Sequence, residues 1–178
     1  MKVRKSNSWH EIEKKISKFK KKQLIELINN LYDLSAENQL FFRTYFSNQD
    51  DLLKPYKKII QESMHPFLEE NEPLNIKAAQ DAVSNYILAT NDLLGKFDLL
   101  CFFIECGTNF ISTYDYPDDD YFETVFDAFE DAVNIAIESP EKEQIQFQKR
   151  LYELIKSASY TGYGFQDELK ILYNKHFE

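Results

Sequence analysis

Residues 112–132, STYDYPDDDYFETVFDAFEDA, place many carboxylates among aromatic side chains, a pattern that could serve a divalent cation. Carboxylate oxygens are ligands that Ca²⁺ and Mg²⁺ prefer. The candidate ligands are Asp118, Asp119, Glu123 and Asp127. An EF-hand loop requires oxygen ligands at its third and twelfth positions, and counting from Asp115 puts Pro117 and Phe126 there. The stretch is therefore no EF-hand loop, and weak cation binding or a catalytic carboxylate pair stay as alternatives.

The same stretch is better explained as the start of a helix with an acidic outer side. Asp118, Asp119 and Asp120 fall where a helix N-terminus presents unpaired N–H groups and the positive end of its dipole. The apolar residues that follow at helical spacing are Phe122, Val125, Phe126, Phe129, Val133 and Ala136. The polar residues on the opposite side are Glu123, Asp127, Glu130, Asp131, Asn134 and Glu138. We therefore predict a capped helix whose carboxylates face solvent.

Other patterns resemble metal-binding or catalytic motifs but lack an essential residue. His10-Glu11 begins like the zinc motif H-E-x-x-H, but Lys14 stands where the second His is required. Glu62 and His65 form one E-x-x-H, whereas a di-iron bundle requires two such motifs and further Glu residues. The chain contains no G-x-S-x-G nucleophile motif. The sequence thus predicts no cofactor and no catalytic residue, and an enzyme is the less favoured interpretation.

Gly162-Tyr163-Gly164 resembles the start of a phosphate-binding loop. The pattern G-x-G-x-x-G would require a third Gly where this chain has Asp167, and no predicted strand precedes it. We expect instead that Gly162 ends one helix in the left-handed conformation and that the next helix begins near Gly164. Tyr163 and Phe165 would then pack this corner. Gly162, Gly164, Phe165 and Asp167 are accordingly predicted to have structural roles.

The remaining candidate is the basic segment 14–22, KKISKFKKK. Its candidate interaction residues are Lys14, Lys15, Lys18, Lys21 and Lys22. We favour a solvated helix here, with an acidic protein surface or a nucleic acid as alternative partners. Nucleic acid is disfavoured because binding usually needs a domain that is basic as a whole.

Charge is distributed unevenly along the chain. Residues 1–60 carry 13 Lys and Arg against 7 Asp and Glu, whereas residues 61–178 carry 8 against 23. The net charge of the whole chain is −9. Such a separation can steer a partner or a second copy of the chain, although it says nothing about the fold.

Size and composition indicate one cytoplasmic domain. The 178 residues are 43% hydrophobic, enough for a core, and no apolar run reaches the length of a membrane span. The basic N-terminal stretch lacks the apolar region of a signal peptide. Cys101 and Cys106 face different ways if they share a helix, so we expect two buried thiols in a reducing compartment.

Apolar residues recur at helical spacing along most of the chain. In residues 21–34 the apolar positions, which we expect to face a core, are Leu24, Leu27, Ile28, Leu31 and Leu34. Further helices are predicted over 36–46, from a capping box at 47–50, from Asn75, over 91–114, from 118, and over 145–157 and 165–176. Gly95 and Gly107 would permit close helix contacts within the most apolar of them.

These elements predict an all-α fold, either a compact multi-helix antiparallel bundle or a short helical-repeat-like array of about eight or nine helices. The chain would form a single domain, with a possible subdivision near residues 66–74. That boundary would separate the basic N-terminal helices from an acidic helical core.

Three segments resemble a known family. They are FKKKQLIELINNLYDLSAENQLFFRTYF at residues 19–46, DLLCFFIECGTNFISTYDYPDDDYFETVFDAF at 98–129, and TGYGFQDELKILY at 161–173. Together they are similar to the uncharacterised bacterial DUF6155 family. The resemblance implies an all-helical bacterial protein and brings no activity with it. The family often has a His where this chain has Gln166.

Three functions follow as hypotheses. The first is a non-enzymatic cytoplasmic protein that binds an unknown protein partner or self-associates. The second is a divalent-metal-binding protein or enzyme that uses carboxylates of residues 115–131. The third is nucleic-acid binding through residues 14–22. No membrane association is expected.

Overall fold

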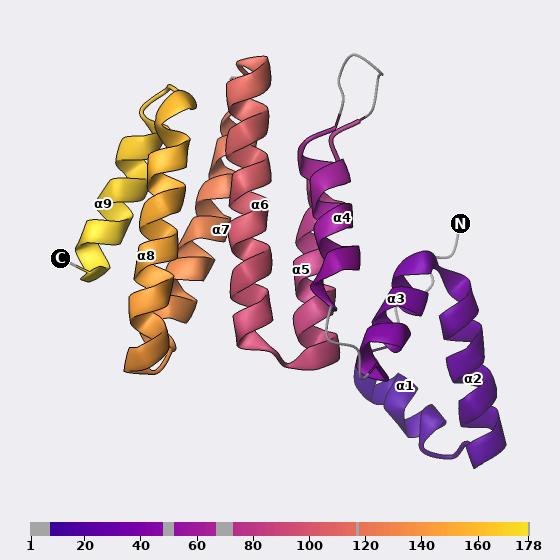
Figure 1. The fold of residues 1–178 in the computed structure, drawn as a ribbon. Helices are drawn as coiled ribbons and strands as arrows, with labels where there is room; N and C mark the ends of the chain where they lie inside the picture. The colour runs from indigo at the N-terminus through magenta and orange to yellow at the C-terminus, as the bar shows by residue number, and fades with distance from the viewer. Residues whose placement is uncertain (1–7, 48–51, 67–72, 117, 178) are drawn as a thin grey trace. The chain divides into compact units, whose positions relative to one another are not determined.

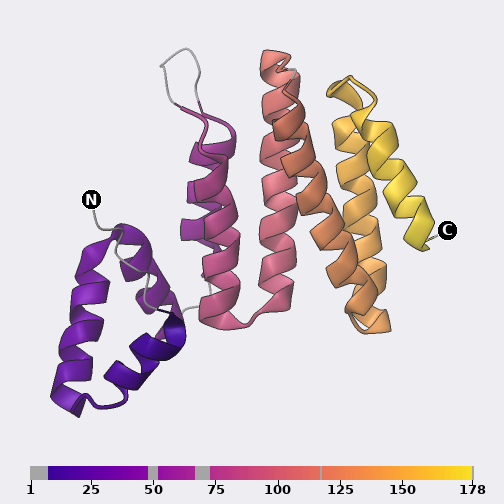
Figure 2. The ribbon, with the colours of Figure 1, turned by 180° about the vertical axis from the view of Figure 1, so that it is seen from behind.

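The helical periodicity of the sequence is realised as nine α-helices and one 3-10 turn, without a strand, in the residues that the computed structural model describes: 8–47, 52–66, 73–116 and 118–177. The ribbon views show this arrangement (Figures 1 and 2) and confirm the all-α prediction. Among these described helices, none has both the length and the hydropathy that a membrane span requires.

The chain divides into two compact units. Unit 1 ends at Ser47 and unit 2 begins at Asn48. We predicted a subdivision near residues 66–74, but the helices on either side of that segment pack against each other within unit 2. Most of the segment itself lies outside the described residues.

Residues 8–47 of unit 1 form three short helices. They are α1 (Trp9–Ile16), α2 (Lys21–Leu34) and α3 (Ala36–Tyr45). Ser35 separates α2 from α3, and its hydroxyl accepts a hydrogen bond from the backbone N–H of Asn38 (3.1 Å), which caps α3. Helices α2 and α3 contact each other, but within the described helices of unit 1 only Thr44 is buried.

The described part of unit 2 contains six α-helices. They are α4 (Leu53–Met64), α5 (Ile76–Thr90), α6 (Leu93–Tyr114), α7 (Asp119–Glu138), α8 (Glu141–Ser157) and α9 (Phe165–Phe177), with a 3-10 turn at Ala158–Tyr160. Helix α6 is the central element, as predicted from its apolar sequence, and α4, α5, α7 and α8 all pack on it. Helix α9 packs on α7 and α8 at the edge of the unit (Figure 1).

Aromatic contacts and one buried hydrogen bond join the helices of unit 2. Phe97 of α6 stacks on Phe147 of α8 with 3.9 Å between the ring centroids. The buried hydroxyl of Tyr121, on α7, donates a hydrogen bond to the backbone carbonyl of Met64, which is the last residue of α4. This bond satisfies a polar group in the core and fixes the start of α7 against the end of α4.

The corner between α5 and α6 is built by one carboxylate. Asp92 caps α6 by accepting a hydrogen bond from the backbone N–H of Gly95 (3.0 Å), and it also accepts one from the hydroxyl of Tyr86 (2.6 Å). Burial and the bond to Asp92 raise the pKa of Tyr86, so the phenol stays a donor. A Cβ at Gly95 would overlap this hydroxyl. The close contact predicted at Gly95 is therefore present.

The bounds of several helices differ from their predictions. Helix α1 was missed, although Ser8 and Glu11 form a capping box in which the Ser8 N–H donates to Glu11 Oε2 (3.3 Å). The capping box predicted at residues 47–50 lies, except for Ser47, outside the described residues. Helix α8 begins at Glu141, directly after Pro140 and four residues before its predicted start at Ile145.

Gly107 lets α6 and α7 approach each other closely. A Cβ at this position would overlap the Cγ2 methyl group of Val125 on α7, and both residues are buried. Replacing Gly107 by Ala should therefore lower the free energy of unfolding by about 1–3 kcal/mol, because overpacking outweighs the better helix propensity of Ala. Urea unfolding followed by circular dichroism measures this change.

Asn109→Ala is the matched control, because Asn109 lies on the same helix and is exposed. Its free energy of unfolding should change by no more than about 0.5 kcal/mol. A Gly107→Ala variant as stable as the parent would contradict the close approach of α6 to α7.

Candidate functional site

The acidic stretch begins α7 as predicted. Asp118 is the N-cap, and its Oδ1 atom accepts a hydrogen bond from the backbone N–H of Tyr121 (2.8 Å). Asp119 and Asp120 occupy the first turn, where their charges complement the helix dipole. Pro117, which precedes the cap, lies outside the described residues.

The two sides of α7 also follow the prediction. Its buried apolar positions include Val125, Phe129, Val133 and Ala136. The exposed acidic residues, which we call the acidic face of α7, are Glu123, Asp127, Glu130, Asp131 and Glu138. Phe122 and Phe126 differ from the rest of the apolar side because they are only half-buried. Their rings are available at the surface, and this was not predicted.

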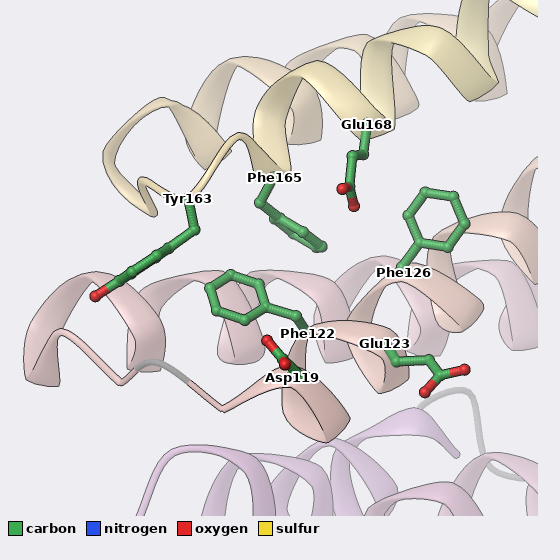
Figure 3. A pocket seen from close by; sticks show the side chains of 7 residues that line it. All are labelled: Asp119, Phe122, Glu123, Phe126, Tyr163, Phe165 and Glu168. Atoms are coloured by element: carbon green, nitrogen blue, oxygen red, sulfur yellow. The ribbon is translucent and has the colours of Figure 1, made fainter.

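A hollow of about 320 Å³ lies between the first half of α7 and the start of α9 (Figure 3). Its lining residues are Asp119, Phe122, Glu123, Phe126, Tyr163, Phe165 and Glu168. In Figure 3 the rings of Phe122 and Phe126 project from α7 toward α9, while Phe165 and Glu168 extend from α9 toward α7. We call this hollow the aromatic pocket.

A second hollow of about 710 Å³ lies along α5, α6 and α7. Its apolar residues include Leu88, which is exposed, and Leu100 and Phe103, which are buried. Its charged residues are Lys96, Asp127, Glu130 and Asp131. Lys96 forms an ion pair with Asp131 (3.6 Å). We call this hollow the α5–α7 groove.

The four predicted metal ligands are not brought together. Asp118 is engaged as a cap, Asp119 and Glu123 line the aromatic pocket, and Asp127 lines the α5–α7 groove. Within the described part of the chain, no group of three or more His, Cys, Asp or Glu residues could hold a metal ion. The structure therefore offers these carboxylates no shared coordination site.

His65 and the two cysteines are packed among other side chains and have structural roles. His65, from the E-x-x-H pattern, packs edge-on against Phe110 and Tyr114, and burial lowers its pKa. Cys101 and Cys106 are both buried and unpaired on α6. Burial raises the pKa of each thiol to about 12, so neither is ionised near neutral pH.

The glycine corner is a turn rather than a phosphate loop. Gly162, Tyr163 and Gly164 all have positive φ angles, of 72°, 54° and 78°. Gly162 follows the 3-10 turn rather than the end of α8 itself, which is a small difference from the prediction. Phe165 is buried and packs on the ring of Phe122 (5.2 Å between centroids). This contact joins the corner to α7.

The residues after the corner start α9. Asp167 lies in its first turn and forms an ion pair with Lys170 (3.4 Å). Gln166 donates a hydrogen bond from Nε2 to the carbonyl of Ile155 on α8 (2.9 Å), which is a structural role.

The basic segment forms a corner between two helices, and not one solvated helix as predicted. Helix α1 ends at Ile16 and α2 begins at Lys21. The exposed side chains, which we call the basic corner, are Lys14, Lys15, Lys18, Lys21 and Lys22. Lys21 lies four positions before Ile25, so the basic corner continues into one side of α2.

Within unit 1 the apolar side of α2 is covered only in part, because Leu24 and Leu27 are half-buried and none of the five apolar positions predicted to face a core is fully buried. Ile28 is 47% exposed, Leu31 43% and Leu34 74%, and Ile25 is also exposed. No residue of α2 is buried. We call the exposed residues of this side, Ile28, Leu31 and Leu34, the α2 face. It is the largest departure of the structure from the burial that the sequence pattern predicts.

No protein-family model, curated protein or solved structure matches the chain. The resemblance to the DUF6155 family therefore stays a prediction.

Asp118 should matter as a cap and not as a metal ligand. Asp118→Ala should lower the free energy of unfolding by about 1 kcal/mol, because the N–H of Tyr121 loses its partner. Asp118→Asn should stay within about 0.5 kcal/mol of the parent, since Asn caps equally well. Thermal unfolding with EDTA, Ca²⁺, Mg²⁺ or Mn²⁺ should give one melting temperature. A rise with one cation that Asp118→Asn abolishes would contradict this assignment.

The two thiols should be unreactive in the folded protein. Burial favours the neutral thiol, and with a pKa of about 12 the thiolate is scarce at pH 8. Iodoacetamide at pH 8 should therefore leave Cys101 and Cys106 unmodified in the native protein, as measured by mass spectrometry. Both should react in guanidinium chloride, which is the control. Rapid modification of either thiol in the native protein would refute their burial.

Proposed function

We propose that the chain is a non-enzymatic protein-interaction module that self-associates, with unit 1 of one copy bound to unit 2 of a second copy. The observation that supports this most directly is the uncovered α2 face. An apolar side of this kind is stable in water when another surface covers it. A unit of 47 residues also buries only a small core, which leaves it marginally stable on its own.

Charge complementarity favours a second copy as the partner. Unit 1 carries 10 Lys and Arg against 5 Asp and Glu, whereas unit 2 carries 11 against 25. Two copies of unit 1 would repel each other, but unit 1 and unit 2 of different copies attract. The basic corner directly precedes the α2 face, so one surface presents both positive charge and apolar area.

The α5–α7 groove has the opposite combination. Asp127 and Glu130 of the acidic face line it beside the exposed side chain of Leu88. In the proposed dimer the α2 face lies on the apolar residues of this groove, and the basic corner lies beside Asp127 and Glu130. A two-fold arrangement, in which each copy gives its unit 1 and receives that of its partner, closes the assembly at two copies.

The apolar part of this contact can be tested at Ile28. Sedimentation equilibrium of the parent at low salt should give twice the chain mass of 21.1 kDa. Ile28→Glu should weaken association at least about tenfold, because it places a charge in the apolar contact. Ile171→Glu is the matched control, since Ile171 is exposed on α9 outside the contact. A monomeric parent at all concentrations would contradict the proposal.

The charged part of the contact can be tested by reversing the charge on one of its two surfaces at a time. One variant carries Lys14→Glu, Lys15→Glu and Lys18→Glu, and the other carries Asp127→Lys and Glu130→Lys. Each variant alone should be monomeric, because like charges then face each other. An equimolar mixture should form dimers, since both contacts of the mixed pair are again complementary. A mixture that stays monomeric would show that unit 1 does not bind unit 2 of another copy.

The two other hypotheses remain weaker proposals. A carboxylate enzyme or metal protein lacks a shared site among the described residues. Nucleic-acid binding would rest on the basic corner in a chain with a net charge of −9. The free, buried cysteines support a reducing, cytoplasmic compartment as the place where the module acts.

A further inference from the structure

The aromatic pocket has an unusual balance of charge. Asp119, Glu123 and Glu168 line it, and none of them forms an ion pair with a Lys or Arg of the described residues. Three other hollows of unit 2 each contain a cationic side chain. Lys96 lines the α5–α7 groove, and Arg150 lines two further hollows. The aromatic pocket is therefore an acidic hollow in which no Lys or Arg of the described residues pairs with the carboxylates.

The same pocket is walled by aromatic rings. Phe122 and Phe165 contact each other, and Phe126 extends the wall along α7 (Figure 3). Phe126 forms no ring pair with another aromatic side chain of the described residues, so its ring is left for other contacts. Tyr163 turns away from the centre of the pocket, and its hydroxyl donates to Asp115 Oδ1 (3.0 Å).

Rings and carboxylates together select one class of ligand. An anion is repelled by Asp119, Glu123 and Glu168. A neutral apolar molecule gains nothing from these charges, and a hydrated metal ion gains nothing from burying ring surface. An organic ammonium ion gains from both, because its methyl or methylene groups contact the rings while its charge lies near ring faces and carboxylates.

We propose that the aromatic pocket binds a small organic ammonium ion. The charge lies between Glu168 and the ring of Phe126, and the alkyl groups contact Phe122 and Phe165. A hollow of about 320 Å³ accommodates a ligand of this size. The site goes beyond the proposed self-association, since the pocket shares no residue with the α2 face, the basic corner or the α5–α7 groove.

Choline and its neutral isostere 3,3-dimethylbutan-1-ol have nearly the same shape, but only choline is charged. Comparing their binding therefore separates the effect of charge from that of shape. Titration of ¹⁵N-labelled protein with choline should shift the amide signals of residues 119–126 and 163–168 saturably. The neutral isostere should bind at least about fivefold more weakly. Mg²⁺ at the same concentration should neither reproduce these shifts nor displace choline.

Two variants test the wall and the charge. Phe126→Leu keeps apolar volume but removes the ring, and should weaken choline binding about three- to fivefold. Glu168→Gln keeps the shape of the side chain but removes its charge, and should weaken binding to a similar extent. Glu138→Gln, at the end of α7 and outside the pocket, is the control and should leave the affinity unchanged. The fingerprint spectrum of each variant shows that it is folded.

Three results would each overturn the proposal. The first is the absence of choline binding, and the second is equal binding of the neutral isostere, which would make the pocket merely apolar. The third is displacement of choline by Mg²⁺, which would reduce the site to a generally acidic surface. Because the pocket and the dimer contact are separate, Ile28→Glu should bind choline as the parent does, whatever its state of association.

Discussion

Helix α6 is the constraint on which the rest of unit 2 depends. Its sequence is apolar around most of its circumference, so one neighbouring helix could not cover it. Helices α4 and α5 cover one part, and α7 and α8 cover the remainder. The two glycines of α6 set how closely these neighbours approach, because Gly95 lies under Tyr86 and Gly107 lies against Val125. Helix α9 is placed by this arrangement only indirectly, through α7 and α8.

Unit 1 has no element of this kind. Its helices are amphipathic rather than apolar all round, and each needs a surface from elsewhere to complete its burial. The two units thus differ, since unit 2 closes a core on itself, whereas unit 1 does not cover its own apolar residues. The two units also differ in charge, because lysines lie near α1 and α2 whereas carboxylates lie on α7. Interaction through unit 1 is therefore the function that we propose.

The sequence predicted what depends on local pattern. The helix starts at Asn75 and Asp118 were recognisable because a short polar side chain precedes an apolar period, and both side chains form the expected capping bonds. The buried and exposed sides of α7 followed from spacing alone. Helix α1 was not predicted because its apolar stripe is short, although the capping box of Ser8 and Glu11 indicates a helix start.

What could not be predicted depends on residues far apart in the chain. Periodicity shows which side of α2 is apolar, but not whether anything covers it. The aromatic pocket could not be predicted because Glu123 and Glu168 belong to different helices. Only the packing of α9 on α7 brings them to one hollow. Conversely, Asp119 and Asp127 are close in sequence but line different hollows, so density of carboxylates was a poor guide to a site.

The position of unit 1 in the chain has a consequence for biosynthesis. A ribosome completes α1, α2 and α3 before any helix of unit 2 has been made. The nascent chain therefore exposes Ile28, Leu31 and Leu34 while the acidic helices are still absent. During that interval the lysines of the basic corner keep this apolar segment soluble through their charge.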